Sequence, residues 1–519
     1  MGAGNPRRSD GEPAAADAPV FRRAGITLVG SAVGGALVIL AEFLAARHLR
    51  VEAYGLYASG MTIARIVEAL AIFGLPVAIF HFLPHYRLKR DAESAAGTIY
   101  AAALLPFAIG SAFGAAVWLL APLLALNVFR NEQAADYIRL LAVAAPFMAG
   151  AEVLGSITRG FGHAGYYVIV KNLIPPVFFL AALGVMALSR AQAIWITGAV
   201  VFGSLTACLA GIAAILHIAG PELRGIRPVF RLRELCKYAA GIMANSGFYI
   251  VFALTGLLAV AYFKGTEALG IYRVCLQLVV PFDMILLAFH AAMGPIYPVL
   301  ARENRVAELE EAYGTAIRWM VMLQLPIGIV LAWNRQDILA LVGPAFTEGA
   351  GAMLVMAVGY SACTCFGTIA YLLMLSGRQT VETWNAASVT ALNVLLAIAL
   401  VPRFGLTGAA LATTSAFVVL NVLRLWEVRR LVRLRTFRPY FLRVFAVSAS
   451  AGVGAHAILH LAGILQGQDA LSLVLRVGAA LAVHALALWA LGLDRKDKDL
   501  LLSMLNSPVR RGLPRDKLP

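Results

Sequence analysis

Apolar residues run through most of the chain in stretches of about 20, separated by short polar segments, and a helix of that length spans the hydrocarbon core of a bilayer. Reading these stretches along the chain predicts about 14 transmembrane helices. Their approximate limits are 25–46, 55–82, 98–124, 137–158, 166–188, 193–219, 236–262, 270–300, 315–333, 349–375, 385–401, 406–428, 442–465 and 471–493. The chain is therefore predicted to be an all-α membrane protein.

The hydrophobic pattern repeats with an offset of 215 residues. Glu52-Ala53-Tyr54-Gly55-Leu56-Tyr57 returns as Glu267-Ala268-Leu269-Gly270-Ile271-Tyr272, and Gly162-His163 returns as Gly377-Arg378. Because six predicted spans separate the partners, both halves cross the membrane in the same direction, about an axis near the membrane normal. We therefore expect two pseudo-symmetric six-helix lobes with a cavity between them, and a C-terminal helix pair outside the repeat.

This organisation divides the chain into five parts. They are a disordered cytoplasmic tail (1–24), an N-lobe with spans 1–6 (25–222), a C-lobe with spans 7–12 (223–430), the helix pair of spans 13 and 14 (431–493) and a basic cytoplasmic tail (494–519). The first residues lack the apolar core of a signal peptide. No loop exceeds about 30 residues, so a folded soluble domain is not expected.

The distribution of charged residues predicts how the chain is oriented in the membrane. The formal net charge is +15, but the basic residues neither form one patch nor alternate with aromatic residues, so nucleic acid is not an expected partner. Alternate loops hold roughly 30 Lys or Arg, against about 7 in the others. The positive-inside rule then places both termini in the cytoplasm, which agrees with an even number of spans.

The sequence has no pattern typical of an enzyme or a metal site. The five cysteines are scattered without metal-ligand spacing, and we expect buried free thiols. No GxxxxGK loop for nucleotide phosphates occurs. We therefore expect no catalytic residue, no metal and no cofactor.

Several short motifs resemble those of a known family. They are 44–49 with 52–57, Gly270-Ile271-Tyr272, 295–300, Leu325-Pro326, 391–396 and 401–413. Together they are similar to the polysaccharide and O-antigen (oligosaccharide) flippase family of the multidrug/oligosaccharidyl-lipid/polysaccharide exporter superfamily, over roughly residues 25 to 430.

This resemblance implies a V-shaped transporter of the bacterial inner membrane. It would move a polyprenyl-pyrophosphate-linked glycan between leaflets by alternating access, with membrane lipids, H⁺ or Na⁺, and a polysaccharide polymerase machinery as further partners. Three other functions stay open: a cation or drug antiporter of the same superfamily, a peptidoglycan-precursor lipid flippase of the same fold, and a membrane enzyme such as a glycan polymerase or ligase. The short outer loops and the duplication count against the enzyme.

Acidic groups inside the predicted spans are candidates for ion coupling, because charge is costly in hydrocarbon and is seldom placed there without a role. Arg65 and Glu68 lie three residues apart, on one helix face. Asp283 follows Glu68 by 215 residues, so the repeat places one carboxylate in each lobe. Glu68 and Asp283 are therefore candidates for binding H⁺ or Na⁺. The alternative is that each merely neutralises a basic neighbour.

Basic groups inside the spans are candidates for binding a diphosphate, because Arg and Lys supply charged hydrogen-bond donors. These candidates are Arg65, Lys171, Arg273 and Arg318. Arg65 lies deepest in its span and is the leading candidate. The other three suit contact with lipid phosphates equally well. Glu42, near the outer end of span 1, is expected to line an outer vestibule or to lie in water at the membrane edge.

Overall fold

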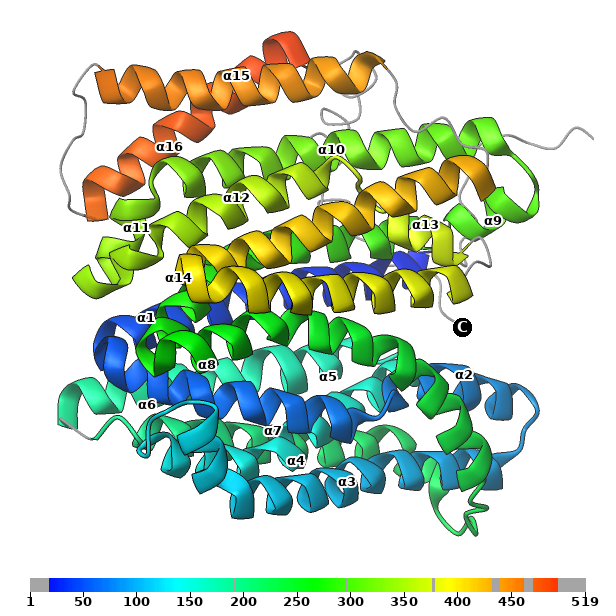
Figure 1. Cartoon of the computed structure of the whole chain (residues 1–519). Coiled ribbons are helices and arrows are strands. Elements are labelled where there is room, and N and C mark those ends of the chain that lie inside the picture. The colour runs from blue at the N-terminus through cyan, green and yellow to red at the C-terminus, as the bar shows by residue number, and fades with distance from the viewer. Residues whose placement is uncertain are drawn as a thin grey trace, which may run out of the picture. The chain divides into compact units, whose positions relative to one another are not determined.

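The computed structural model describes residues 18–189, 192–294, 296–375, 379–431, 439–461 and 470–492, and every regular element among them is helical (Figure 1). The predicted all-α class is confirmed. The terminal tail 494–519 and the repeated Gly377-Arg378 lie outside the described residues, as does 1–17 of the predicted N-terminal tail. The first helix begins at Ala18, earlier than its apolar stretch.

The chain forms two compact units, Met1–Val280 with Ala386–Ala416, and Pro281–Asn385 with Phe417–Pro519. The first unit contains α1 (Ala18–Ile72), α2 (Leu75–Leu88), α3 (Ala92–Asn127), α4 (Ala134–Gly160), α5 (Ala164–Tyr167), the π-helix η1 (Val168–Leu173), α6 (Ile174–Ser189), α7 (Trp195–Leu223) and parts of α8 (Leu232–Met293) and α14 (Gln379–Leu431). The limits expected for the two lobes remain a prediction.

The second unit contains the remaining parts of α8 and α14 and the other helices. These are α9 (Ile296–Arg302), α10 (Val306–Trp333), α11 (Arg335–Val342), the 3₁₀ helix η2 (Pro344–Gly349), α12 (Ala350–Thr364), α13 (Ile369–Leu375), α15 (Pro439–Leu461), α16 (Ala470–Ala487) and the π-helix η3 (Leu488–Gly492). Within this unit α10 packs against both α12 and α15.

Nine helical stretches among the described residues are long and apolar enough to cross a membrane. Three of them are double-length and correspond to two predicted spans each; α12 with α13, and α15, are shorter and correspond to spans 10 and 13. Counted in this way, the helices match the expected spans. The double-length helices α1, α8 and α14 each contain one residue with non-helical backbone angles, at Arg50, Gly265 and Gly405, between the predicted spans.

The internal repeat is visible in the backbone. Arg50 has φ 63° and ψ 170°, and Gly265, which follows it by 215 residues, has φ 86° and ψ −176°. A Cβ atom on Gly270 would lie 3.0 Å from the Cα of Gly55, its repeat partner. Equivalent residues of a two-fold repeat contact each other only near the symmetry axis. The repeat axis therefore passes close to Gly55 and Gly270.

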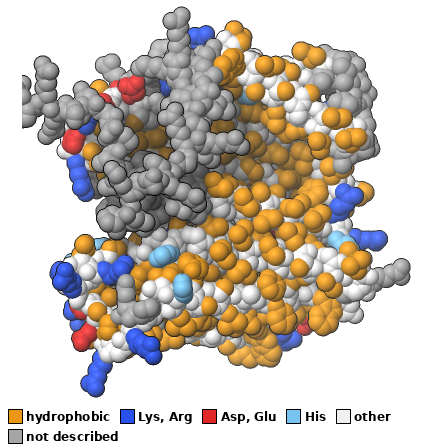
Figure 2. Space-filling model, turned by 180° about the vertical axis from the view of Figure 1, so that it is seen from behind, with side chains coloured by type: hydrophobic (Ala, Val, Ile, Leu, Met, Phe, Trp, Pro, Cys, Tyr) orange, Lys and Arg blue, Asp and Glu red, His pale blue; other side chains and the backbone are white. Residues whose placement is uncertain are grey.

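The surface is that of a protein surrounded by lipid. Figure 2 shows hydrophobic side chains over most of the described surface on one face, with Lys and Arg at its margins. Large apolar side chains such as Leu119 (71% exposed) and Leu188 (90% exposed) have little packing against the rest of the chain. In contrast, 78% of the most apolar stretch of α4 is buried, because α4 packs against α1, α3 and α7. Apolar exposure of this extent fits a bilayer as solvent.

Candidate functional site

Lys171 lies on η1, a short π-helix inserted between α5 and α6. Pro175 and Pro176 follow, and because proline has no amide hydrogen, the carbonyls of Lys171 and Asn172 have no α-helical donor four residues later. The π-helical turn rotates the side chains before it relative to those after it. The sequence contained the proline pair as a signal, but apolar periodicity alone did not predict the π-helix.

Two glycines allow η1 to approach α1 closely. A Cβ atom on Gly34 would overlap Asn172, and one on Gly30 would overlap Val168. Their four-residue spacing is typical of tight helix contacts in membranes. Next to Gly30, Ser31 Oγ accepts a hydrogen bond of 3.0 Å from the side-chain Nδ2 of Asn172. This contact fixes the position of Lys171 relative to α1.

Four charged side chains from α1, α4 and η1 form a continuous ion-pair network. Arg65 donates to Glu68 at 2.7 Å. Lys171 Nζ lies 3.2 Å from Glu68 Oε1 and 3.0 Å from Glu152 Oε2. Tyr167 also donates to Glu152, at 3.4 Å. The structure thus brings together three sequence candidates, Arg65, Glu68 and Lys171, and adds Glu152.

The network leaves Arg65 accessible. The Glu68 side chain is only 5% exposed, whereas that of Arg65 is 47% exposed and contacts Glu68 through one nitrogen. Buried Glu68, which pairs with both Arg65 and Lys171, therefore holds the Arg65 side chain in place, and Arg65 keeps further hydrogen-bond donors available. Arg159 lies next to this group, with its guanidinium carbon 4.0 Å from the Tyr167 ring centre. With three basic groups against two acids, the site carries excess positive charge.

Arg273 occupies a second, fully buried cluster in the same unit. Its guanidinium binds Glu42 through two nitrogens, at 2.6 Å and 3.4 Å. Tyr54 and Tyr57 donate to the same carboxylate at 2.7 Å and 3.4 Å. The expectation that Glu42 lies in a vestibule or in water is wrong: it is 6% exposed, because a partner 231 residues away compensates its charge.

The two remaining candidates belong to the second unit. Arg318 on α10 donates to Thr315 at 3.2 Å, one turn earlier on the same helix. Asp283 on α8 is exposed and makes no ion pair or hydrogen bond with any residue that the structure describes. Glu68 and its repeat partner therefore differ in their surroundings: Glu68 is held by two cations, and Asp283 by none among the described residues.

Sequence reasoning missed a polar cluster on α14. Arg424 binds Glu382 through two nitrogens, and both side chains are buried. Asn385 donates to Glu427 at 2.6 Å. The predicted span began at 385, so Glu382 fell outside it, but α14 begins at Gln379. Polar residues spaced three apart on both halves of the helix were the available signal.

Comparison with known proteins identifies a matching family and a similar protein. The model of a family described as polysaccharide biosynthesis protein matches residues 44–348. An uncharacterized membrane protein of Methanocaldococcus jannaschii, MJ1068, is 22% identical over 207 residues, which cover 39% of this chain and 40% of that protein. The chain thus matches about two fifths of the length of this relative.

Solved structures share the fold. One, described as lipid II flippase MurJ in an inward closed conformation, has a TM-score of 0.70 at 13% identity, covering 92% of this chain and 99% of that chain. Another, an inward-facing multidrug resistance MATE family transporter of the MOP superfamily, has a TM-score of 0.64 at 14% identity, covering 79% and 98%. At these identities the likeness concerns the fold alone.

Proposed function

The chain belongs to the polysaccharide biosynthesis protein family, and we propose that it translocates a polyprenyl-pyrophosphate-linked oligosaccharide across the bacterial inner membrane by alternating access. It is a multi-pass membrane protein with the fold of MOP superfamily transporters. In the proposed orientation both termini lie in the cytoplasm, and the protein performs no covalent chemistry. A polymerase that uses the exported glycan is the expected partner.

The observation that carries the proposal is the accessible, positively charged site around Arg65. Stripping water from a diphosphate and from sugar hydroxyls is costly unless the protein supplies replacement partners. The Arg65 fork matches phosphate oxygens, and buried Glu68 holds it in place. Lys171 adds a second positive charge beside the same acid.

The same site bears on the other candidate functions. A drug antiporter that carries cations needs an acidic or apolar cavity, and the excess of basic groups here disfavours such cargo. A lipid II flippase carries a lipid diphosphate too, so the cationic site suits it equally, and the fold likeness to one leaves this second candidate open. The two differ in the glycan, which the assay below distinguishes.

For ion coupling we propose Asp283 as the principal group. A carboxylate that exchanges H⁺ or Na⁺ must be able to lose its counter-charge, and Asp283 has no basic partner among the described residues. Glu68 is paired with Arg65 and Lys171, which favours a positioning role. Lys171 and Arg318 remain proposed substrate contacts secondary to Arg65, whereas for the buried Arg273, which pairs with Glu42, a structural role is proposed instead.

The test is a flipping assay in proteoliposomes that carry a fluorescent polyprenyl-pyrophosphate oligosaccharide, with leaflet accessibility measured by an impermeant reagent. We expect Arg65→Ala to slow translocation by about tenfold to hundredfold, the value of a charge-assisted hydrogen bond. Because Arg65 is half exposed, the substitution should lower the free energy of unfolding by about 1 kcal/mol or less. Arg65→Lys should recover little, since lysine lacks the planar fork.

Arg139→Ala is the matched control. Arg139 is 37% exposed and pairs with Asp136 three residues away, as Arg65 does with Glu68, but it lies outside the network. It should translocate at the wild-type rate. Full translocation by Arg65→Ala would refute the proposed site. Lipid II moved in place of the oligosaccharide, or efflux of a cationic dye alone, would favour the corresponding alternative.

A further inference from the structure

One face of α4 carries Glu152, Gly155 and Arg159, at helical spacing. Arg159 lies in the last turn of the helix, about 10.5 Å along the axis from Glu152. Gly155 makes room between them for the ring of Tyr167, since a Cβ atom at Gly155 would lie 2.9 Å from one of the ring carbons. Arg159 and the acid that Lys171 binds therefore lie along the same face, with Tyr167 between them.

Tyr167 connects Arg159 to the Arg65 network. Its hydroxyl donates to Glu152 at 3.4 Å, and its ring centre lies 4.0 Å from the guanidinium carbon of Arg159. Because this ring lies over Gly155, the Arg159 side chain leans back along α4 toward the network. An arginine that only carries its charge into water at the end of a spanning helix extends in the opposite direction.

The guanidinium group of Arg159 is oriented by aromatic rings and has no oxygen acceptor. The ring centre of Phe80 on α2 lies 4.9 Å from its guanidinium carbon, because α2 packs against α4. The Arg159 side chain makes no hydrogen bond or ion pair with any residue that the structure describes, and its Nε is buried. Aromatic rings attract a cation but leave its N–H donors without an oxygen atom. A buried donor without an acceptor is costly, so this side chain is suited to an anion that supplies one.

The network and Arg159 are two cationic positions at different depths. At the deeper one, Lys171 and Arg65 pair with Glu68. Arg159 is in the last turn of a helix long enough to span the bilayer, so it lies close to the membrane surface. A hydrogen bond adds about 2.8 Å at each end of an anion, which brings both positions within the reach of a diphosphate but not of a single phosphate.

We propose that Arg159 binds one phosphate of the lipid-linked substrate while Arg65 and Lys171 bind the other. Arg159 is then the residue that selects pyrophosphate-linked over monophosphate-linked lipids, since only a diphosphate contacts both positions at once. Guanidinium N–H groups match phosphate oxygens, and the two aromatic rings hold this guanidinium in place for them. This inference rests on the proposed function and adds the basis of its selectivity.

The test compares two fluorescent lipids that differ only in the linkage, a polyprenyl-pyrophosphate oligosaccharide and its polyprenyl-phosphate counterpart. Binding of each to the purified full chain in detergent micelles is measured by fluorescence anisotropy. The wild type should bind the diphosphate at least tenfold more tightly, about the value of one charge-assisted hydrogen bond. Arg159→Gln should weaken binding of the diphosphate about tenfold and leave that of the monophosphate within about twofold, so that most of the preference is lost.

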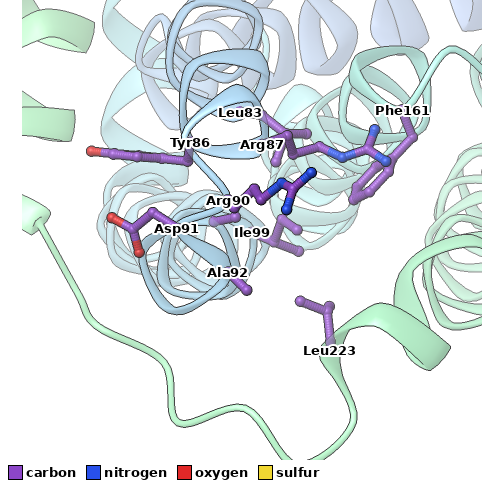
Figure 3. A pocket seen from close by; sticks show the side chains of 10 residues that line it. Leu83, Tyr86, Arg87, Arg90, Asp91, Ala92, Ile99, Phe161 and Leu223 are labelled. Carbon is purple, nitrogen blue, oxygen red and sulfur yellow. The ribbon is translucent and has the colours of Figure 1, made fainter.

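Arg87→Gln is the matched control. The guanidinium carbon of Arg87 lies 4.9 Å from the ring centre of Phe161, two residues after Arg159, so this variant also removes a positive charge from an aromatic ring near the end of α4. Arg87 lines a separate pocket of about 320 Å³ where α2 ends and α3 begins, and no residue of the Arg65 network lines that pocket (Figure 3). Arg87→Gln should leave both affinities within about twofold of the wild type.

Arg65→Ala separates this inference from the proposed function, because it removes the contact that both lipids share and should weaken both. If Arg65→Ala weakens both and Arg159→Gln changes neither, only the role of Arg159 is overturned. Equal weakening of both lipids by Arg159→Gln would also overturn it, since loss of packing acts on both alike. Unchanged binding of both lipids together with loss of retained phosphatidylglycerol in native mass spectrometry would assign Arg159 to the bilayer phospholipid instead. No binding of either lipid by the wild type would overturn this inference and the proposed function together.

Discussion

The buried pair between Glu42 and Arg273 allows a quantitative test of the electrostatics. Both side chains are less than 10% exposed, and the Glu42 carboxylate accepts hydrogen bonds from Arg273, Tyr54 and Tyr57. The cavity beside Glu42 is about 10 Å³, at the lower limit for one water molecule. Water therefore cannot replace a lost partner without rearrangement of the surrounding side chains.

Arg273→Met removes the positive charge and leaves the carboxylate in a dry site. Removing one partner of a buried pair costs about 3–5 kcal/mol. The two tyrosines remain as donors to the charged oxygen atoms, so we expect the lower end, about 3 kcal/mol. In the double variant Glu42→Gln, Arg273→Met no charge is left, and the tyrosines can donate to the amide oxygen. That variant should lose only about 1 kcal/mol.

The assay is equilibrium unfolding of the purified chain in mixed detergent micelles, monitored by tryptophan fluorescence and circular dichroism. The two variants should therefore differ by about 2 kcal/mol, and the single variant Glu42→Gln completes the double-mutant cycle from which the coupling energy between the two positions follows. Arg305→Met is the control, because Arg305 forms a comparable pair with Glu308 at an exposed site, and it should leave the midpoint unchanged within error. If Arg273→Met and the double variant lost equal stability, desolvation of an unpaired carboxylate would not be the cause.

Two further predictions concern the repeat axis and ion coupling. Gly55→Ala should lower the free energy of unfolding by about 1–3 kcal/mol, because its Cβ atom would overlap the Thr266 carbonyl. Gly184→Ala is the control: its Cβ atom meets open space inside α6, so it should be neutral or slightly stabilising in the same unfolding experiment. Asp283→Asn should abolish the dependence of flipping on an imposed H⁺ or Na⁺ gradient, whereas Glu68→Gln should slow flipping about tenfold and retain that dependence. Gradient-driven transport that survived in Glu68→Gln combined with Asp283→Asn would show that neither acid couples transport.

Features that depend on local sequence could be predicted. Span limits follow from hydrophobic length, so the stretch expected at 166–188 is found as α5, η1 and α6 at 164–189. The Arg65–Glu68 pair follows from helical spacing. The family resemblance, based on short motifs within and between the spans, was confirmed by the match over residues 44–348.

Features that depend on contacts between distant segments could not be predicted. Helical periodicity indicates which face of α1 carries Glu42, but not that Arg273, 231 residues later, lies against it. Helical periodicity also does not indicate that Glu152 lies near Glu68. Lys171, on the π-helical turn η1, pairs with both acids. Arg424 and Glu382 lie 42 residues apart on the two halves of one helix, so their pairing depends on how α14 bends at Gly405.

The repeat preserves backbone geometry more closely than charge. Positions 50 and 265 share an unusual backbone conformation, and Gly55 and Gly270 share a close contact, because two halves around one axis need the same turn and the same small residue. Charged side chains take no part in this turn or this contact, so the two halves can differ in charge.

The charged positions have diverged in this way. At the positions 215 residues after Arg65 and Lys171 the chain has Val280 and Ala386, so neither cation has a counterpart in the second half. Glu68 has one, Asp283, but without basic partners among the described residues. In the proposed function, the basic groups that would bind a diphosphate therefore belong to one half of the repeat, and the acid proposed for ion exchange belongs to the other.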